Sequence, residues 1–224
     1  MLRPTRWGSG DGDLGLRGKV RFAAFLLVAS LAHPHAARAS LAPPPRQGAA
    51  DIALDARYGA GDADAPVVLV LYACGRSKAC ADLVPLLHSE VTGGRLKGKV
   101  RMYVRPYFPA AEEDAVLCGR ALVAAAEQGM FWPYLLYLYE HRDDFQRCLL
   151  ARWASLRGLD RDAFDLGVSS AKTTETLAGI RTEALRNGVD RVPCAFINGQ
   201  KVTETPSVAL LTDLLEREFR RVSR

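Results

Sequence analysis

The sequence lacks an apolar run long enough to cross a membrane. The apolar stretch Phe22–Ala32 would rise only about 16 Å as a helix, roughly half the thickness of a hydrocarbon core. A basic cluster from Arg17 to Arg21 precedes it, and Ala37-Arg38-Ala39 follows it with the small-x-small pattern that signal peptidase cleaves. We therefore predict a signal peptide over residues 1–39, cleavage near Ala39, and a periplasmic or extracellular location for the exported protein.

The predicted mature chain also lacks an excess of positive charge. The whole chain has 30 Lys and Arg against 25 Asp and Glu, but residues 1–39 hold six of the basic and two of the acidic residues. The rest has 24 basic and 23 acidic residues, so its charge gives no reason to expect nucleic-acid binding. No cysteine precedes Cys74, so the predicted cleavage site offers no thiol for a lipid anchor.

Several motifs of catalysis and cofactor binding are missing as well. The sequence has no glycine-rich phosphate loop and no Gly-x-Ser-x-Gly motif around a nucleophilic serine. His88 and His141 stand alone, without the spacing of metal ligands. We therefore predict no metal site and no cofactor.

The residues that follow the signal peptide predict one α/β domain. Segment 40–65 begins as a proline-rich tether, and the domain extends over 66–224. The apolar, β-branched run Val67–Tyr72 predicts a strand that is buried on both faces. Helical spacing follows from Ser77 to Gly94, and Lys99–Val104 predicts a second strand. Two strands joined by a helix in this way form a right-handed βαβ unit with parallel strands.

The second half of the domain predicts a helical block and then a second sheet unit. Residues from about 110 to 188 contain no convincing strand, and their periodicity predicts four or five helices. Val192–Ile197 predicts a strand, Asn198-Gly199 a two-residue hairpin turn, and Lys201–Thr203 the return strand. A last helix is expected from Ser207 to about Arg221. The predicted order is βαβ, a helical insertion, then ββα.

This order resembles the thioredoxin superfamily, and specifically its DsbA-like branch, over roughly Ile52 to Arg221. Four short motifs carry the resemblance: Asp64-Ala65-Pro66, Glu127–Trp132, Gly158-Leu159-Asp160 and Val192–Gly199. The resemblance implies a thioredoxin-like fold with an inserted helical subdomain. It also implies a cis peptide bond between Val192 and Pro193, beside the redox site, and a substrate-binding role for these two residues.

The resemblance places the family's Cys-x-x-Cys motif at Ser77-Lys78-Ala79-Cys80. In the family, a helix N-terminus stabilises the first cysteine as a thiolate, and the second cysteine resolves the mixed disulfide. Here the nucleophile position holds a serine, whose hydroxyl is not ionised at neutral pH and cannot exchange with a disulfide. We therefore predict that Ser77 caps the helix and that Cys80 is the remaining member of the pair.

Two more cysteines fall at the same site by this resemblance. Cys74 lies three residues before Ser77, and Cys194 follows the expected cis-proline. Cys74 and Cys80 would close only a short loop, so geometry rather than chain entropy decides whether they pair. A relocated redox pair, a static disulfide and unpaired buried thiols all remain open.

The other two cysteines lie in the helical block. Five cysteines are an odd number, so at least one thiol is free, reactive or intermolecular. Cys118 and Cys148 are candidates for a structural disulfide, which would contribute roughly 3.5 kcal/mol on the chain-entropy model. The alternative is two core thiols on separate helices, too far apart to be bridged.

Two functions follow from the resemblance. The first is an extracytoplasmic thiol-disulfide oxidoreductase with an altered Ser-x-x-Cys site, whose working pair is Cys74 with Cys80 or Cys80 with Cys194. The second is a redox-silent binding or chaperone module that keeps a peptide-binding groove beside Pro193. The expected partners are cysteine-containing or unfolded exported proteins, and a membrane redox partner is a further candidate for the first function.

Overall fold

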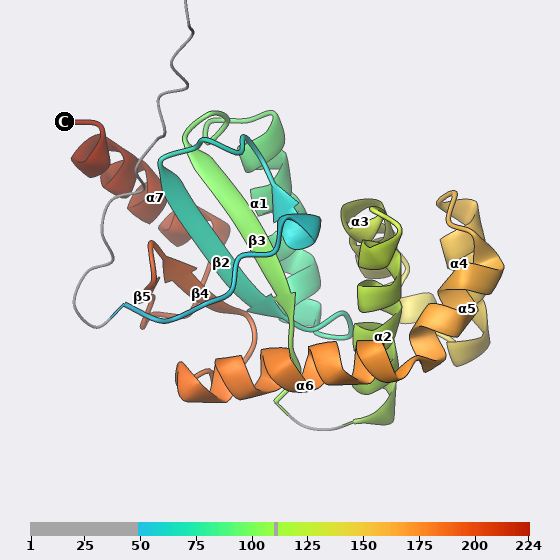
Figure 1. The fold of residues 1–224 in the computed structure, drawn as a ribbon. Coiled ribbons are helices and arrows are strands. Elements are labelled where there is room, and N and C mark those ends of the chain that lie inside the picture. Colours follow the sequence, from blue (N-terminus) through green and yellow to red (C-terminus); the bar gives the residue numbers. More distant parts are fainter. Residues whose placement is uncertain (1–48, 110–111) are drawn as a thin grey trace, which may run out of the picture. The chain divides into compact units, whose positions relative to one another are not determined.

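The computed structural model describes residues 49–109 and 112–224. The predicted signal peptide and residues 40–48, the start of the predicted tether segment, lie outside the described residues. Those described belong to one compact unit, 40–224. They include five strands in a single sheet, in the order β1-β3-β2-β4-β5 (Figure 1). None of the helices within the described ranges is long and apolar enough to span a bilayer.

The central strands come from the apolar runs of the first half. β2 (Val67–Ala73) and β3 (Val100–Pro106) are parallel, and α1 (Lys78–Thr92) connects them. This is the predicted βαβ unit. The two-residue strand β1 (Gly59–Ala60) pairs antiparallel with β3 at the edge of the sheet.

A short hairpin completes the sheet on the other side of β2. β4 (Cys194–Ile197) is antiparallel to β2, and β5 (Gln200–Lys201) returns beside β4. Asn198 and Gly199 have φ angles of 47° and 77°, the left-handed values that a tight hairpin turn requires. The Asn-Gly turn is therefore confirmed. Both strands are shorter than predicted, and β4 begins only after Pro193, which has no N–H to donate to the ladder.

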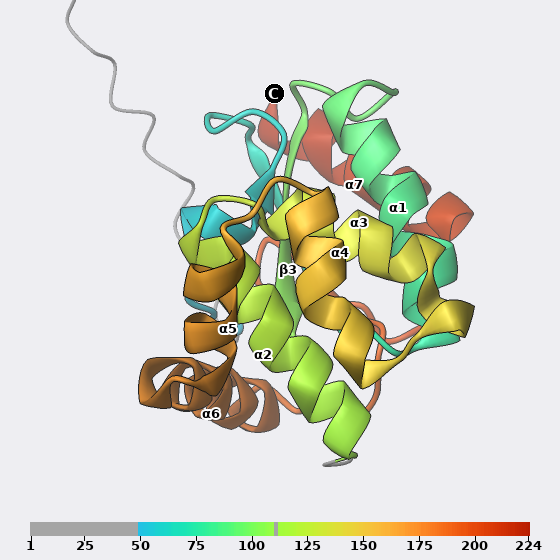
Figure 2. The ribbon, with the colours of Figure 1, turned by 90° about the vertical axis from the view of Figure 1, so that its right-hand side faces the viewer.

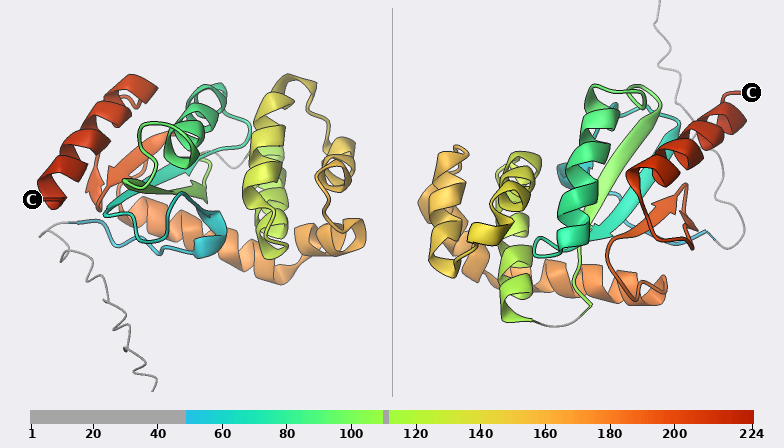
Figure 3. Two further views of the ribbon diagram at one scale, coloured as in Figure 1. Left: turned by 90° about the horizontal axis from the view of Figure 1, so that it is seen from above. Right: turned by 180° about the vertical axis from the view of Figure 1, so that it is seen from behind.

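Helices cover both faces of the sheet. α1 and α7 (Val208–Val222) lie on one face, and α6 (Ala171–Arg186) lies on the other (Figure 3). The buried residues divide accordingly into two apolar clusters. The larger includes Leu211 of α7, and the smaller joins Ile180 of α6 to Tyr72 of β2.

The helical block that the sequence predicts between the two halves of the sheet is present. Its helices are α2 (Glu113–Glu127), α3 (Phe131–Glu140), α4 (Leu150–Leu156), α5 (Arg161–Ser169) and α6. α2 contacts α3, α5 and α6, and Figure 2 shows it running through the block. Its buried Ala121, Ala124 and Ala125 are small, which lets the neighbouring helices approach closely.

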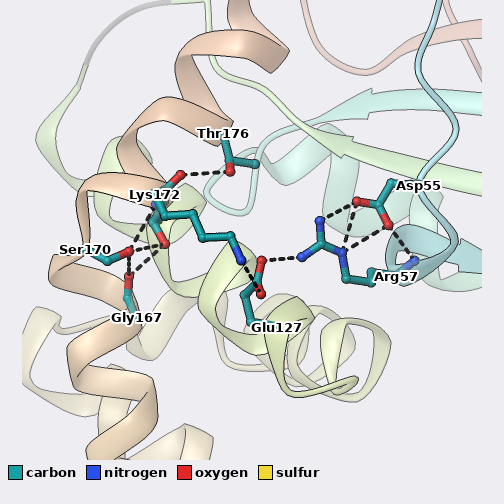
Figure 4. A network of polar contacts seen from close by, with 8 residues as sticks. Asp55, Arg57, Glu127, Gly167, Ser170, Lys172 and Thr176 are labelled. Atoms are coloured by element: carbon teal, nitrogen blue, oxygen red, sulfur yellow. Dashed lines mark hydrogen bonds and ion pairs between the residues drawn. The ribbon is translucent and has the colours of Figure 1, made fainter.

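A surface network joins the block to the start of the domain (Figure 4). Glu127, at the end of α2, forms ion pairs with Arg57 and with Lys172 of α6, the latter at 2.9 Å. Arg57 also pairs with Asp55 at 2.6 Å. Exposed pairs of this kind contribute about 1 kcal/mol or less each, so the network aligns the segments more than it stabilises them.

A buried ion pair ties α6 to the sheet. Glu183 of α6 accepts hydrogen bonds from the Arg105 guanidinium of β3 at 3.1 and 3.2 Å and from the Tyr72 hydroxyl at 2.7 Å. It also accepts one from the backbone N–H of Ala53 at 2.8 Å, which fastens the start of the domain to α6. Both charged side chains are buried, so each depends on the other for compensation.

We predict that Glu183→Gln lowers the free energy of unfolding by about 3 kcal/mol, because it leaves the buried Arg105 without a counter-charge. Urea unfolding followed by circular dichroism measures this change. Glu175→Gln, at an exposed position of the same helix, is the matched control and should change it by less than about 0.5 kcal/mol. Equal effects of the two substitutions would contradict the role given to the buried pair.

Candidate functional site

The site is built on the turn between β2 and α1. Ser77 is the N-cap of α1, as the sequence predicts: its Oγ accepts a hydrogen bond from the backbone N–H of Cys80 at 3.3 Å. The backbone N–H of Ser77 donates to the carbonyl of Cys74 at 3.1 Å, which closes the turn. The helix N-terminus therefore stabilises a neutral hydroxyl where a thiolate would otherwise lie.

The strand register brings a second segment to the same end of the sheet. Tyr72 of β2 pairs with Cys194 of β4, so Pro193 lies next to the point where β2 ends and the turn begins. The peptide bond between Val192 and Pro193 is cis, as the resemblance implied. The turn and the cis-proline are therefore neighbours across the β2–β4 pair.

Three thiols gather behind the turn. Cys74 is 8% exposed, whereas Cys80 of α1 and Cys118 of α2 are 0% exposed. A Cβ atom placed on Gly75 would lie 3.4 Å from the Cβ of Cys118, so α2 reaches the turn directly. The hydroxyl of Tyr139, on α3, donates to the carbonyl of Cys74 at 3.4 Å. The sequence did not predict that Cys118 and Tyr139 lie beside the turn, because no local pattern relates α2 and α3 to it.

Burial keeps these thiols protonated. It raises the pKa of Cys80 to about 11 and that of Cys118 to about 12. Burial also raises the pKa of Cys74 and of Cys194, although hydrogen bonds from the backbone of Arg76 and Ser77 partly offset the effect at Cys74. Because the thiolate is the nucleophile, none of the four is activated as in a low-pKa redox cysteine.

Arg76 joins the turn to the helical block, and sequence reasoning missed it too. Its backbone N–H donates to the Sγ of Cys74 at 3.4 Å. Its guanidinium lies over the ring of Phe145, 4.1 Å from the ring centroid, and donates to the carbonyl of Arg142 at 2.7 Å. The positive charge of Arg76 favours the thiolate form of Cys74, whereas the negative charge of Glu112 disfavours it.

The remaining cysteines lie apart from this cluster. Cys194 belongs to the apolar cluster under α6, whereas Cys80 belongs to the cluster under α1 and α7. This arrangement favours Cys74 over Cys194 as the partner of Cys80. Cys148 is exposed, and both it and Cys118 are free thiols here. Their predicted disulfide is not formed in this structure, and it stays a prediction.

The histidines have structural neighbours. His88 packs on Trp132, with ring centroids 4.4 Å apart, and His141 packs on Tyr137 at 4.2 Å. Within residues 49–109 and 112–224, no group of three or more Cys, His, Asp or Glu side chains is placed to hold a metal ion.

Comparison with protein families and curated proteins gives two findings. The family model described as Thioredoxin matches residues 55–217. The chain is 31% identical over 149 residues to the Na(+)/H(+) antiporter NhaA 1 of Mycolicibacterium vanbaalenii. The aligned region covers 62% of this chain and 23% of that antiporter. The chain is also 27% identical over 163 residues to the Na(+)/H(+) antiporter NhaA of Herminiimonas arsenicoxydans, and this alignment covers 71% of this chain and 25% of the antiporter. The chain thus spans about a quarter of the length of these relatives.

Solved structures share the fold. BdbD from Bacillus subtilis superimposes with a TM-score of 0.66 at 14% identity, over 77% of this chain and 97% of that one. A thioredoxin-like oxidoreductase from Silicibacter pomeroyi gives a TM-score of 0.62 at 18% identity, over 75% and 99%. At these identities the likeness establishes the thioredoxin-like fold.

The burial of Cys80 predicts a loss of stability at alkaline pH. The pKa of Cys80 rises from 9.0 to about 11 on folding. Its contribution to the free energy of unfolding is therefore complete below pH 9 and is lost as the pH rises through 11. The loss attributable to Cys80 is about 3 kcal/mol. Urea unfolding at several pH values measures it, and Cys80→Ala should flatten the pH dependence by this amount.

Cys148→Ala, which removes an exposed thiol, is the control for that comparison. A Cys80→Ala variant whose stability falls with pH as steeply as that of the original protein would show that the thiol is not buried as described.

Proposed function

Because the chain belongs to the thioredoxin family, we propose that it exchanges disulfides with exported proteins through an altered active site, in which Cys74 attacks and Cys80 resolves. One observation carries the proposal. Cys74 and Cys80 flank the turn that Ser77 caps, and the β2–β4 pairing brings Val192 and Pro193 to that same turn. The two thiols therefore lie beside the segment for which the family resemblance implies a substrate-binding role, and this supports the proposal.

The exchange begins with the Cys74 thiolate. It attacks one sulfur of a client disulfide, so that a Cys74–client disulfide forms and the other client sulfur leaves as a thiolate. Cys80 then attacks the Sγ of Cys74 and releases the second client sulfur. The client gains two electrons and two protons, and Cys74 and Cys80 become a disulfide. The reverse sequence oxidises a client dithiol.

Accessibility decides which thiol reacts first. Cys74 is the least buried member of the three-thiol cluster, at 8% exposed, and the Arg76 charge and backbone N–H favour its thiolate. Burial opposes this effect and raises its pKa. The exchange should therefore be slower than in an enzyme with a cysteine at the helix N-terminus.

Export supports this chemistry, because disulfides persist outside the cytoplasm. The signal-peptide pattern of residues 1–39 supports an extracytoplasmic location, and cysteine-containing or unfolded exported proteins are the proposed partners. The likeness to antiporters concerns a quarter of their length, so it suggests a shared domain and supports no transport activity.

The missing nucleophile gives the sharpest test. Ser77→Cys places a thiol at the N-terminus of α1 and should raise the rate of dithiothreitol-linked insulin reduction roughly tenfold or more, because the helix N-terminus lowers the pKa of a thiol there. In the original chain, Cys74→Ser should abolish the slow basal activity, because it removes the attacking thiol, and Cys80→Ser should lower it at least severalfold, because it removes the proposed resolving thiol.

Cys148→Ser is the control and should leave that activity unchanged, since Cys148 is exposed and lies outside the cluster. Basal activity that is unaltered in Cys80→Ser would rule out the proposed pair.

A redox-silent binding module is the second candidate, and the raised pKa values favour it. With the helix N-terminus occupied by Ser77 and with buried, protonated thiols, the domain could bind unfolded clients beside Pro193 without exchange. On this alternative, the triple variant Cys74→Ser, Cys80→Ser, Cys194→Ser binds reduced, unfolded polypeptide with an unchanged Kd. Isothermal calorimetry measures the Kd, and loss of binding by a folded triple variant would count against this candidate.

A further inference from the structure

Cys118 is a buried thiol that the proposed exchange does not use. It lies on α2 and is fully buried, although it is distant in sequence from the turn. Its Cβ would be 3.4 Å from a Cβ on Gly75, and Gly75 directly follows Cys74. Because residue 75 has no side chain, the backbone of the turn lies against Cys118.

The surroundings of Cys118 place it with Cys74 and Cys80. Tyr139 donates a hydrogen bond to the carbonyl of Cys74, and the pKa of its phenol is raised by burial first and then by the neighbouring Cys80, Cys74 and Cys118. Burial is the main cause of the raised pKa of Cys118, and Cys74 has the next largest effect on it, ahead of Arg76 and Asp114. Cys80, Cys118 and Tyr139 also belong to the same buried apolar cluster.

We propose that Cys118 is a second resolving thiol for Cys74, so that Cys74 pairs alternately with Cys80 and with Cys118. The proposal rests on the proposed function, because it takes Cys74 as the reacting thiol. The Cβ atoms of a disulfide lie about 3.5–4.5 Å apart, and Cys118 lies against Gly75, the residue next to Cys74, so the link requires the turn to move until Cys74 faces Cys118.

The chemistry needs no added oxidant once Cys74 is in a disulfide. The Cys118 thiolate attacks the Sγ of Cys74, a Cys74–Cys118 bond forms, and the Cys74–Cys80 bond breaks. Cys80 leaves with the electron pair and takes up the proton that Cys118 lost. A mixed disulfide with a client is resolved in the same way, with the client thiolate as the leaving group.

The two disulfides would have different structural effects. A Cys74–Cys80 bond stays within the turn and the first residues of α1. A Cys74–Cys118 bond links the turn to α2, and thus the sheet unit to the helical block. Resolution by Cys118 would couple the redox state of the site to the helical block.

Peptide mapping after oxidation tests the proposal. Trypsin cleaves after Arg76, Lys78, Arg95, Arg120, Arg147, Arg152, Arg191 and Lys201, so each of the five cysteines falls on a separate peptide. The full chain and its variants are incubated with oxidised glutathione, blocked with N-ethylmaleimide, digested at low pH without reductant and analysed by mass spectrometry.

The expected links are specific to each variant. Cys80→Ala should give the Cys74–Cys118 peptide as its main internal link. Cys118→Ala should give the Cys74–Cys80 peptide, and Cys74→Ala should give neither of these two linked peptides. The original chain and the control Cys148→Ala should give both links. If circular dichroism shows that Cys80→Ala is unfolded, the presence or absence of the Cys74–Cys118 link in the original chain tests the proposal instead.

The failures of the two proposals are distinguishable. Absence of the Cys74–Cys118 link, while Cys118→Ala still forms the Cys74–Cys80 link, overturns the role of Cys118 and leaves the proposed function intact. A Cys118–Cys148 link in the original chain also overturns it, because Cys118 would then be a structural cysteine. Absence of every link to Cys74 overturns both proposals.

Discussion

The antiparallel pairing of β4 with β2 is the constraint on which the site depends. It sets Tyr72 opposite Cys194 and so fixes Pro193 at the end of β2, where the chain turns into α1. Without this register, the cis-proline segment would not lie beside the turn that carries Cys74, Ser77 and Cys80. The buried pair of Glu183 and Arg105 holds α6 against the sheet at β3, the other neighbour of β2.

Burial packs the three thiols into the core and limits their reactivity. Side chains of α2 and α3 exclude water from Cys80 and Cys118, which makes them good packing residues. The same exclusion disfavours the thiolate and raises the pKa of both. Ser77 occupies the helix N-terminus, where a cysteine would be stabilised as a thiolate. Cys74 is the least buried of the three thiols, and the Arg76 charge and backbone hydrogen bonds oppose the effect of burial on its pKa.

Much of the fold could be predicted because its signals are local. The apolar run that becomes β2, the Asn198-Gly199 turn and the Ser77 cap each occupy a few consecutive residues, and the motif around Pro193 implied the cis bond. The place of Cys118 could not be predicted, because the packing of α2 against the turn sets it. The one local signal was Gly75, which leaves room for a close approach but does not say by what.

Nuclear Overhauser effects between β2 and β4 test the central claim most directly. In the reduced, isotope-labelled protein, the described register predicts cross-strand contacts between Tyr72 and Cys194 and between Leu71 and Ala195. Contacts from Tyr72 and Leu71 to β3 alone, with none to β4, would contradict the account, because the thiols and Pro193 would then no longer belong to one site.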